Sequence, residues 1–92
     1  MDKGHEEMIQ ALRSRSYESL SIKRYVRRYS EPHTCDCWLV IRMNGEDRCF
    51  VNRFGKRPDY RHVWQIRKWL RKQFEIAPES IPVDVYDHGC QE

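Results

Sequence analysis

The chain has 92 residues, which is enough for one domain around a single hydrophobic core, so we expect one domain spanning residues 1–92. Lys and Arg number 17 against 14 Asp and Glu, which gives a net charge of only +3. The first ten residues are polar and no apolar run is long enough to cross a bilayer, so we expect a cytoplasmic protein with reduced cysteines and no membrane partner.

The modest net charge conceals a strong segregation of charge. Residues 53–72 carry eight basic residues and one acidic residue, and residues 13–28 carry six basic residues and one acidic residue. Residues 75–92 carry five acidic residues and no Lys or Arg. Local clusters of this kind, more than the total, determine the field that a polyanion meets. Arginine outnumbers lysine by 12 to 5, and its guanidinium group suits bidentate contact with phosphate.

The first third of the chain predicts a helix and then a strand. Residues 5–14 are expected to be a short helix, because Met8, Ile9 and Leu12 recur at helical spacing. Residues 17–29 favour a strand, since their aliphatic residues fall at even spacing. Residues 30–34 contain Pro32 and are expected to be a loop.

A hairpin is expected next. Residues 35–43 and 48–54 are rich in strand-forming residues and flank Asn44-Gly45, a pair typical of two-residue hairpin turns. With this turn, Arg42 faces Asp47 and forms a favourable cross-strand ion pair. Alternation along the two strands separates two faces. One face carries Cys37, Leu39, Ile41 and Phe50, and the other carries Trp38, Val40, Arg42, Val51 and Arg53.

The remainder of the chain predicts a long helix and a final strand. Residues 60–74 show an apolar stripe at helical spacing, with Asp59 as the expected N-cap. Residues 81–86 alternate as a strand does. The expected fold is therefore α+β, in the order α-β-β-β-α-β, with both helices packed on an antiparallel sheet of three to four strands.

The basic side of the long helix is the main candidate site. Its charges are almost all positive and have no acidic neighbours at helical spacing, which favours phosphate contact over an ordinary solvated helix face. The expected contact residues are Arg53, Lys56, Arg57, Arg61, Trp64, Lys68, Arg71 and Lys72. A second group comprises Arg24, Arg27 and Arg28. For this group, contact with a partner and protection of an edge strand by charge are equally good interpretations.

The outer face of the hairpin is a further candidate surface. Trp38 beside Arg42 and Arg53 could stack on a base. However, Met8 and Leu12 need an apolar surface, so we expect the N-terminal helix to cover this face and to make Trp38 part of the core.

Metal binding and catalysis are not expected. His33, Cys35 and Cys37, and also His88 with Cys90, are candidate ligands, but their spacing departs from that of zinc sites. No motif of a nucleophile, a metalloprotease or a phosphate-binding loop is present. We therefore expect a non-enzymatic protein without a cofactor, a bound metal or a small-molecule substrate.

Part of the chain resembles DNA-binding domains that read DNA with a sheet. The run Tyr25-Val26-Arg27-Arg28, the strand residues 38–42, Asn44-Gly45, the residues 49–51, Phe54-Gly55 and the following helix are similar to plant ethylene-response domains and phage integrase arm-binding domains. In those families the sheet enters the major groove. The resemblance implies DNA contacts from Arg27, Trp38, Arg42 and Arg53, and a small sequence-specific DNA-binding regulator or excisionase-like factor is the alternative function.

In size and character the whole chain resembles the small anti-CRISPR proteins of phages, in particular inhibitors of type I-F surveillance complexes. Those proteins are small, lack catalytic motifs and act by binding. The resemblance implies an inhibitor that binds a CRISPR surveillance ribonucleoprotein through an arginine-rich surface and blocks access of target DNA. The expected partner is therefore a ribonucleoprotein complex or nucleic acid.

Overall fold

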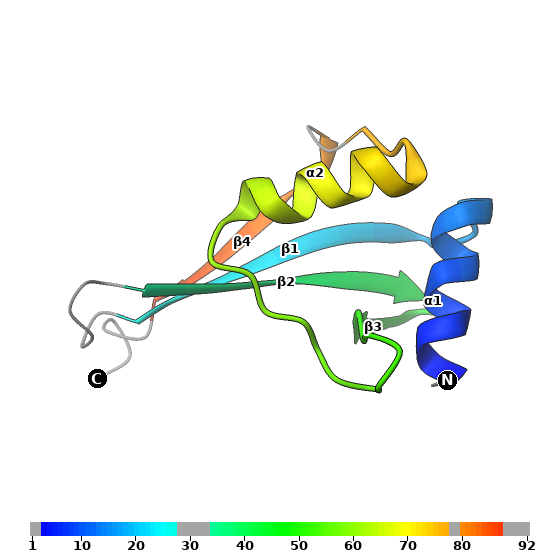
Figure 1. Cartoon of the computed structure of the whole chain (residues 1–92), viewed down its shortest axis with the longest axis horizontal. Coiled ribbons are helices and arrows are strands. Elements are labelled where there is room, and N and C mark those ends of the chain that lie inside the picture. Colours follow the sequence, from blue (N-terminus) through cyan, green and yellow to red (C-terminus); the bar gives the residue numbers. More distant parts are fainter. Residues whose placement is uncertain (1–2, 28–33, 78–79, 88–92) are drawn as a thin grey trace.

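The computed structural model describes residues 3–27, 34–77 and 80–87, with the elements in the order α-β-β-β-α-β (Figure 1). This order and the α+β class confirm the expectation from the sequence. The elements are α1 (Lys3–Ser14), β1 (Ser19–Arg27), β2 (Thr34–Met43), β3 (Glu46–Cys49), α2 (Val63–Phe74) and β4 (Val83–Asp87).

The four strands form one mixed sheet in the order β3-β2-β1-β4. β1 pairs antiparallel with β2, and β2 pairs antiparallel with β3. β4 runs parallel to β1, which corrects the expectation of an antiparallel sheet. The reason is the connection: α2 carries the chain back along the sheet, so β4 starts from the end where β1 starts (Figure 1).

The predicted hairpin register is confirmed. Arg42 faces Asp47, and the flanking pairs are Val40 with Cys49 and Met43 with Glu46. Asn44 and Gly45 have φ angles of 54° and 77°, the positive values that a type I′ turn requires at both central positions. Arg42 Nη1 lies 3.4 Å from Asp47 Oδ1, which confirms the expected ion pair.

The second hairpin strand ends earlier than predicted, at Cys49 instead of Phe54. The Phe50 N–H still donates to the Leu39 carbonyl over 2.8 Å, and then the chain leaves the sheet. Asn52 redirects it, because its side-chain oxygen accepts hydrogen bonds from the Phe54 and Lys56 N–H groups over 2.9 and 3.1 Å. This local turn competes with continued strand pairing.

The long helix begins later than predicted, at Val63, with His62 as its N-cap in place of Asp59. Tyr60 is extended because it pairs with the edge of β2: its N–H and carbonyl bond the Cys37 carbonyl and N–H over 2.8 and 2.7 Å. Gln65 Oε1 then accepts a hydrogen bond from the His62 N–H over 3.1 Å and closes the first turn.

Both helices pack on one face of the sheet. α2 lies along the strands and α1 crosses their end (Figure 1). Their apolar side chains meet the strands in one core, whose most deeply buried members are Met8, Leu12, Ile22, Cys37, Ile41, Ile66 and Leu70. Fully burying one such large aliphatic side chain contributes roughly 1.5–3 kcal/mol.

The face of the sheet opposite the helices, called the open sheet face below, carries Trp38. Alternation from Cys37 and Leu39, which are both in the core, directs Trp38 to this other side. The expectation that α1 covers Trp38 is therefore wrong, because Met8 and Leu12 pack with Ile66 on the α2 side. The open sheet face comprises Ser19, Ser21, Lys23, Tyr25, Asp36, Trp38, Val40, Arg42, Asp47, Cys49 and Asp84.

The described helices are short. α1 and α2 have 12 residues each, and no helix in the described part of the chain is long and apolar enough to span a bilayer.

Candidate nucleic-acid interface

One side of α2 is polar and points away from the sheet. Ile66 and Leu70 are fully buried, and Val63 and Phe74 pack against the same core. At 3.6 residues per turn, the opposite side therefore faces solvent. We call its exposed residues, Trp64, Lys68, Arg71 and Lys72, the basic helix face. The structure thus brings together four of the five residues that the sequence placed on this side of the helix. The fifth, Arg61, lies before the helix, because α2 begins at Val63.

The charges of this face are largely unbalanced. The first turn of α2 has no acidic residue. Among the described residues, Lys68 and Lys72 have no ion-pair partner, and neither has Arg61, which is exposed just before the helix. Exposed, unpaired cations on one helix side produce a local positive potential that attracts polyanions.

The described part of the acidic segment does not cover the basic helix face. Glu75 forms the C-cap of α2 in a left-handed conformation. The chain then returns through β4, where Asp84 lies on the open sheet face and pairs with Lys23. Arg15 donates hydrogen bonds to the Phe74 and Glu75 carbonyls over 3.0 and 3.3 Å, so a cation occupies the negative end of the helix dipole.

Arg67 is a basic residue of α2 that the sequence analysis did not select. Its side chain is half-buried at the flank of the helix, between the core side and the basic helix face. Its Nε is hidden from solvent and has no hydrogen-bond partner in the described part of the chain. Its position between Trp64 and Arg71 at helical spacing was the available signal.

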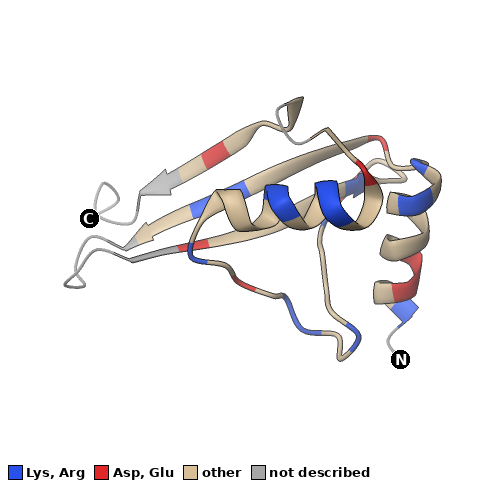
Figure 2. Ribbon diagram, turned by 45° about the horizontal axis from the view of Figure 1, so that its top comes forward, with Lys and Arg blue, Asp and Glu red and all other residues tan. Residues whose placement is uncertain are grey.

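The loop before α2 contributes three predicted cations, and basic positions follow one another along this loop and α2 (Figure 2). The side chains of the three loop cations have different surroundings. Arg57 is held away from the helix: its guanidinium carbon lies 4.0 Å from the centre of the Trp38 ring, and its Nε lies 2.9 Å from Asp59 Oδ1. Arg53 lies over the Phe54 ring, 4.9 Å from its centre. Lys56 is exposed and has no ion pair to another described residue.

The second predicted basic group is described only in part. Arg24 in β1 is exposed and lies on the helix side of the sheet, since it follows the buried Ile22 by two residues. The side chain of Arg27 and the whole of Arg28 lie outside the described residues.

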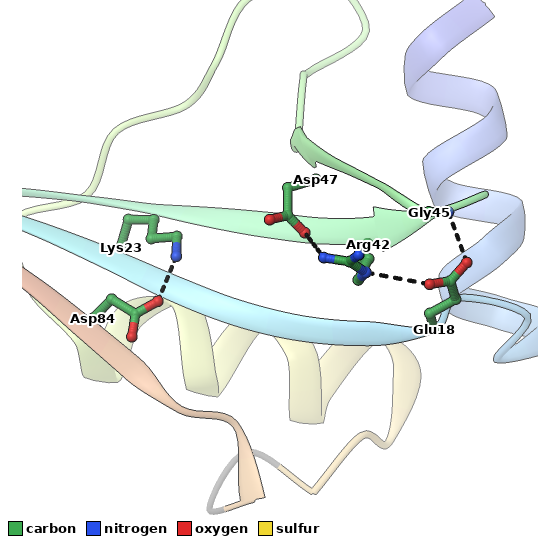
Figure 3. A network of polar contacts seen from close by, with 6 residues as sticks. All are labelled: Glu18, Lys23, Arg42, Gly45, Asp47 and Asp84. Atoms are coloured by element: carbon green, nitrogen blue, oxygen red, sulfur yellow. Dashed lines mark hydrogen bonds and ion pairs between the residues drawn. The ribbon is translucent and has the colours of Figure 1, made fainter.

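The open sheet face carries basic residues whose charges are balanced. Lys23 pairs with Asp84, and Arg42 contacts both Glu18 at 3.3 Å and Asp47 at 3.4 Å (Figure 3). Glu18 also accepts a hydrogen bond from the Gly45 N–H over 2.8 Å. Exposed pairs of this kind contribute roughly 0–1 kcal/mol each. Their main effect here is to reduce the positive potential of this face.

A pocket lined by aromatic rings lies beside α2, and it was not predicted from the sequence. It has a volume of about 310 Å³ and lies between the first turn of α1, the loop 52–58 and Trp69. Its residues come from three separate parts of the chain: α1, the segment 50–60 and α2. Burial raises the pKa of the half-buried Tyr60 in its wall, because desolvation disfavours the phenolate. The one sequence signal was an aromatic residue in the turn Asn52 to Gly55.

Cysteines and histidines do not form a metal cluster in the part of the chain that is described. No group of three or more His, Cys, Asp or Glu side chains there is arranged to hold a metal ion. Cys37 is buried and Cys49 is exposed, and neither forms a disulfide with another described residue. Of the predicted ligands, His33, His88 and Cys90 lie outside the described residues, and only the backbone of Cys35 is described.

Comparisons with protein-family models, with curated proteins and with solved structures found no match to this chain. Its function is therefore inferred from the geometry and the charges of its own residues. The basic helix face is the described surface on which exposed cations are grouped around an exposed tryptophan.

Proposed function

We propose that this protein is a non-enzymatic binding protein that engages a nucleic-acid-containing partner through the basic helix face. The observation that carries the proposal is the contrast between the two sides of the molecule. Lys23 and Arg42 on the open sheet face have acidic partners, whereas Lys68 and Lys72 on α2 have none among the described residues. Phosphate groups of a partner would supply the missing counter-charge.

Trp64 gives this surface a second kind of contact. Its side chain is 59% exposed, and its ring stacks on His62 with centroids 6.1 Å apart and planes inclined by 13°. A large exposed aromatic side chain among cations is the composition found at positions that dominate binding energy. Trp64 would therefore contact a base or an apolar part of the partner while the neighbouring cations bind phosphates.

The more specific form of the proposal is inhibition of a CRISPR surveillance ribonucleoprotein in the cytoplasm. In this form the basic helix face binds the guide RNA or an acidic edge of the complex, and the bulk of the domain blocks target DNA. Its support is the small size, the absence of catalytic motifs in the sequence and the one-sided charge of α2.

The alternative function is sequence-specific DNA binding through the open sheet face. The acidic residues on this face make it a weaker proposal than binding through the basic helix face. Arg42 would have to exchange its contacts with Glu18 and Asp47 for a base edge. Removing one partner from such a pair leaves acidic groups near the phosphates. The sheet is also extended by β4, whose Asp84 adds negative charge to the same face.

The test is binding of labelled duplex DNA, single-stranded DNA and structured RNA over a series of salt concentrations. We expect affinity that falls steeply with salt, and loss of binding in the double variant Lys68→Glu/Lys72→Glu. The matched control is Lys3→Glu/Arg13→Glu, which reverses two exposed cations on α1. Unchanged binding by the α2 variant would refute the assignment of this surface. Sequence-selective duplex binding that depends on Arg42 would instead favour the DNA-binding alternative.

A further inference from the structure

The aromatic pocket beside α2 has a rigid inner wall. Phe50 is only 5% exposed, and its ring centre lies 5.1 Å from that of Trp69. Trp69 also meets Phe74 edge-on at 5.2 Å. On the other side, His5 lies 5.7 Å from Phe50, and its Nδ1 is within hydrogen-bond distance, 2.8 Å, of the Val51 carbonyl. The inner rings are thus fixed by the core and do not need a ligand to order them.

The rim of the pocket carries an aromatic side chain that the core does not use. Phe54 lines the pocket and is 71% exposed. The turn that holds it is closed by hydrogen bonds: besides the two to the Asn52 side chain, the Asn52 N–H donates to the Lys56 carbonyl at 2.8 Å and the Gly55 N–H donates to the Asn52 carbonyl at 2.9 Å. Because the backbone of this turn is already held in place, less conformational entropy is lost when Phe54 contacts a ligand.

A cation and a hydrogen-bond donor line the same pocket, and a second cation lies nearby. Arg53 is a lining residue and lies over the Phe54 ring, whereas Lys56 stands outside the lining, two residues after Phe54 on the same turn. Tyr60 in the wall carries a phenol hydroxyl, which is protonated at neutral pH and is therefore a hydrogen-bond donor. A ligand with a flat π-face, hydrogen-bond acceptors on its edge and a phosphate beside it matches these groups. A nucleotide has all three features.

We propose that the pocket receives one unstacked base of a single-stranded nucleic acid, with Phe54 stacking on the base and Arg53 and Lys56 contacting its phosphates. This inference rests on the proposed function and specifies its ligand. The volume of about 310 Å³ is at the small end of ligand pockets, which suits one base and not a base pair. Bases inside a duplex are stacked and paired, so single strands bind more tightly than duplexes of the same sequence.

The variant Phe54→Ala tests the stacking contact. Because Phe54 is exposed, its removal leaves the core intact. Loss of one base-aromatic stack corresponds to a fall in affinity of about 5- to 150-fold. Phe54→Tyr is the matched control, since it keeps the ring and should retain affinity. The probes are a short labelled single-stranded RNA, a single-stranded DNA of the same sequence, their duplexes, and a single strand in which abasic sites replace the bases.

The outcomes separate this inference from the proposed function. Preference for single strands that is lost with abasic sites and weakened in Phe54→Ala, but not in Phe54→Tyr, supports it. Equal binding of single strands and duplexes, unaffected by Phe54→Ala but weakened by Lys68→Glu/Lys72→Glu, overturns the pocket and leaves the proposed function standing. Absence of binding to every oligonucleotide at low salt overturns the pocket inference and the phosphate contacts, and leaves only the form of the proposed function in which the basic helix face binds an acidic protein edge of a ribonucleoprotein. The RNA and DNA probes show which sugar the ligand carries.

Discussion

Neutralising Lys68 and Lys72 should flatten the dependence of affinity on salt by a calculable amount. Each phosphate that a cation neutralises changes the slope of log K against log salt by about −0.9 for duplex DNA and about −0.7 for a single strand. Both lysines are exposed and have no ion-pair partner among the described residues, so each is available for one phosphate. Lys68→Gln/Lys72→Gln should therefore reduce the slope by about 1.8 or 1.4. When salt rises from about 50 to about 200 mM, the fold loss of affinity of the wild-type protein should exceed that of the variant by a factor of about 12 for duplex DNA and about 7 for a single strand.

Fluorescence anisotropy of a labelled oligonucleotide at several salt concentrations measures this slope. Lys3→Gln/Arg13→Gln is the matched control, since it removes the same charge from exposed positions of α1. Surface substitutions of this kind change stability by about 0.5 kcal/mol or less, which urea unfolding of both variants verifies. An equal change of slope in the two variants would show that total charge, and not the basic helix face, determines binding. An unchanged slope in the α2 variant would show that these lysines do not contact phosphates.

Two further predictions concern the fold. Leu70→Ala opens a cavity where α2 meets the sheet and should lower the free energy of unfolding by about 2–5 kcal/mol; a loss below about 1 kcal/mol in urea unfolding would place α2 off the core. Burial raises the pKa of Tyr60, so its contribution to stability is complete below the usual pKa of 10.0 and is lost as pH rises through the folded-state pKa. Tyr60→Phe should remove that part of the alkaline loss, and identical alkaline stability curves for the two proteins would contradict the burial of this phenol.

Local signals in the sequence predicted local structure well. The register of the hairpin followed from Asn44-Gly45, because a two-residue turn with two positive φ angles leaves one way for the strands to pair. The side of α2 that faces solvent followed from the spacing of Ile66 and Leu70. Both features depend on residues a few positions apart, so neither requires knowledge of the rest of the chain.

The predicted start of the long helix was wrong because a residue distant in the sequence pairs with this segment. The helix was expected to start at residue 60, but Tyr60 pairs with Cys37 and is held in an extended conformation. Strand pairing across this distance is not encoded in the pattern around Tyr60. The direction of β4 was predicted wrongly, as antiparallel, because the alternation of a strand is the same whether its neighbour runs parallel or antiparallel.

In the candidate site, too, contacts between residues distant in the sequence decided what local patterns could not. From the sequence alone, Lys68 was the favoured phosphate contact and Arg42 was expected to pair with Asp47, whereas no partner was assigned to Lys23. The fold distinguishes them, because it brings Asp84 to Lys23 across 61 positions and Glu18 to Arg42 across 24, and no acidic residue in the described part of the chain to Lys68.

By itself the sequence determined the class and order of the elements, the hairpin register and the basic side of α2, because hydrophobic periodicity and turn residues act over short distances. Tertiary structure alone decided which sheet face both helices cover, which cations are neutralised and how His5, Phe50, Tyr60 and Trp69 meet in one pocket. Periodicity states which residues share a face, but which faces pack together depends on the free energy of the whole core.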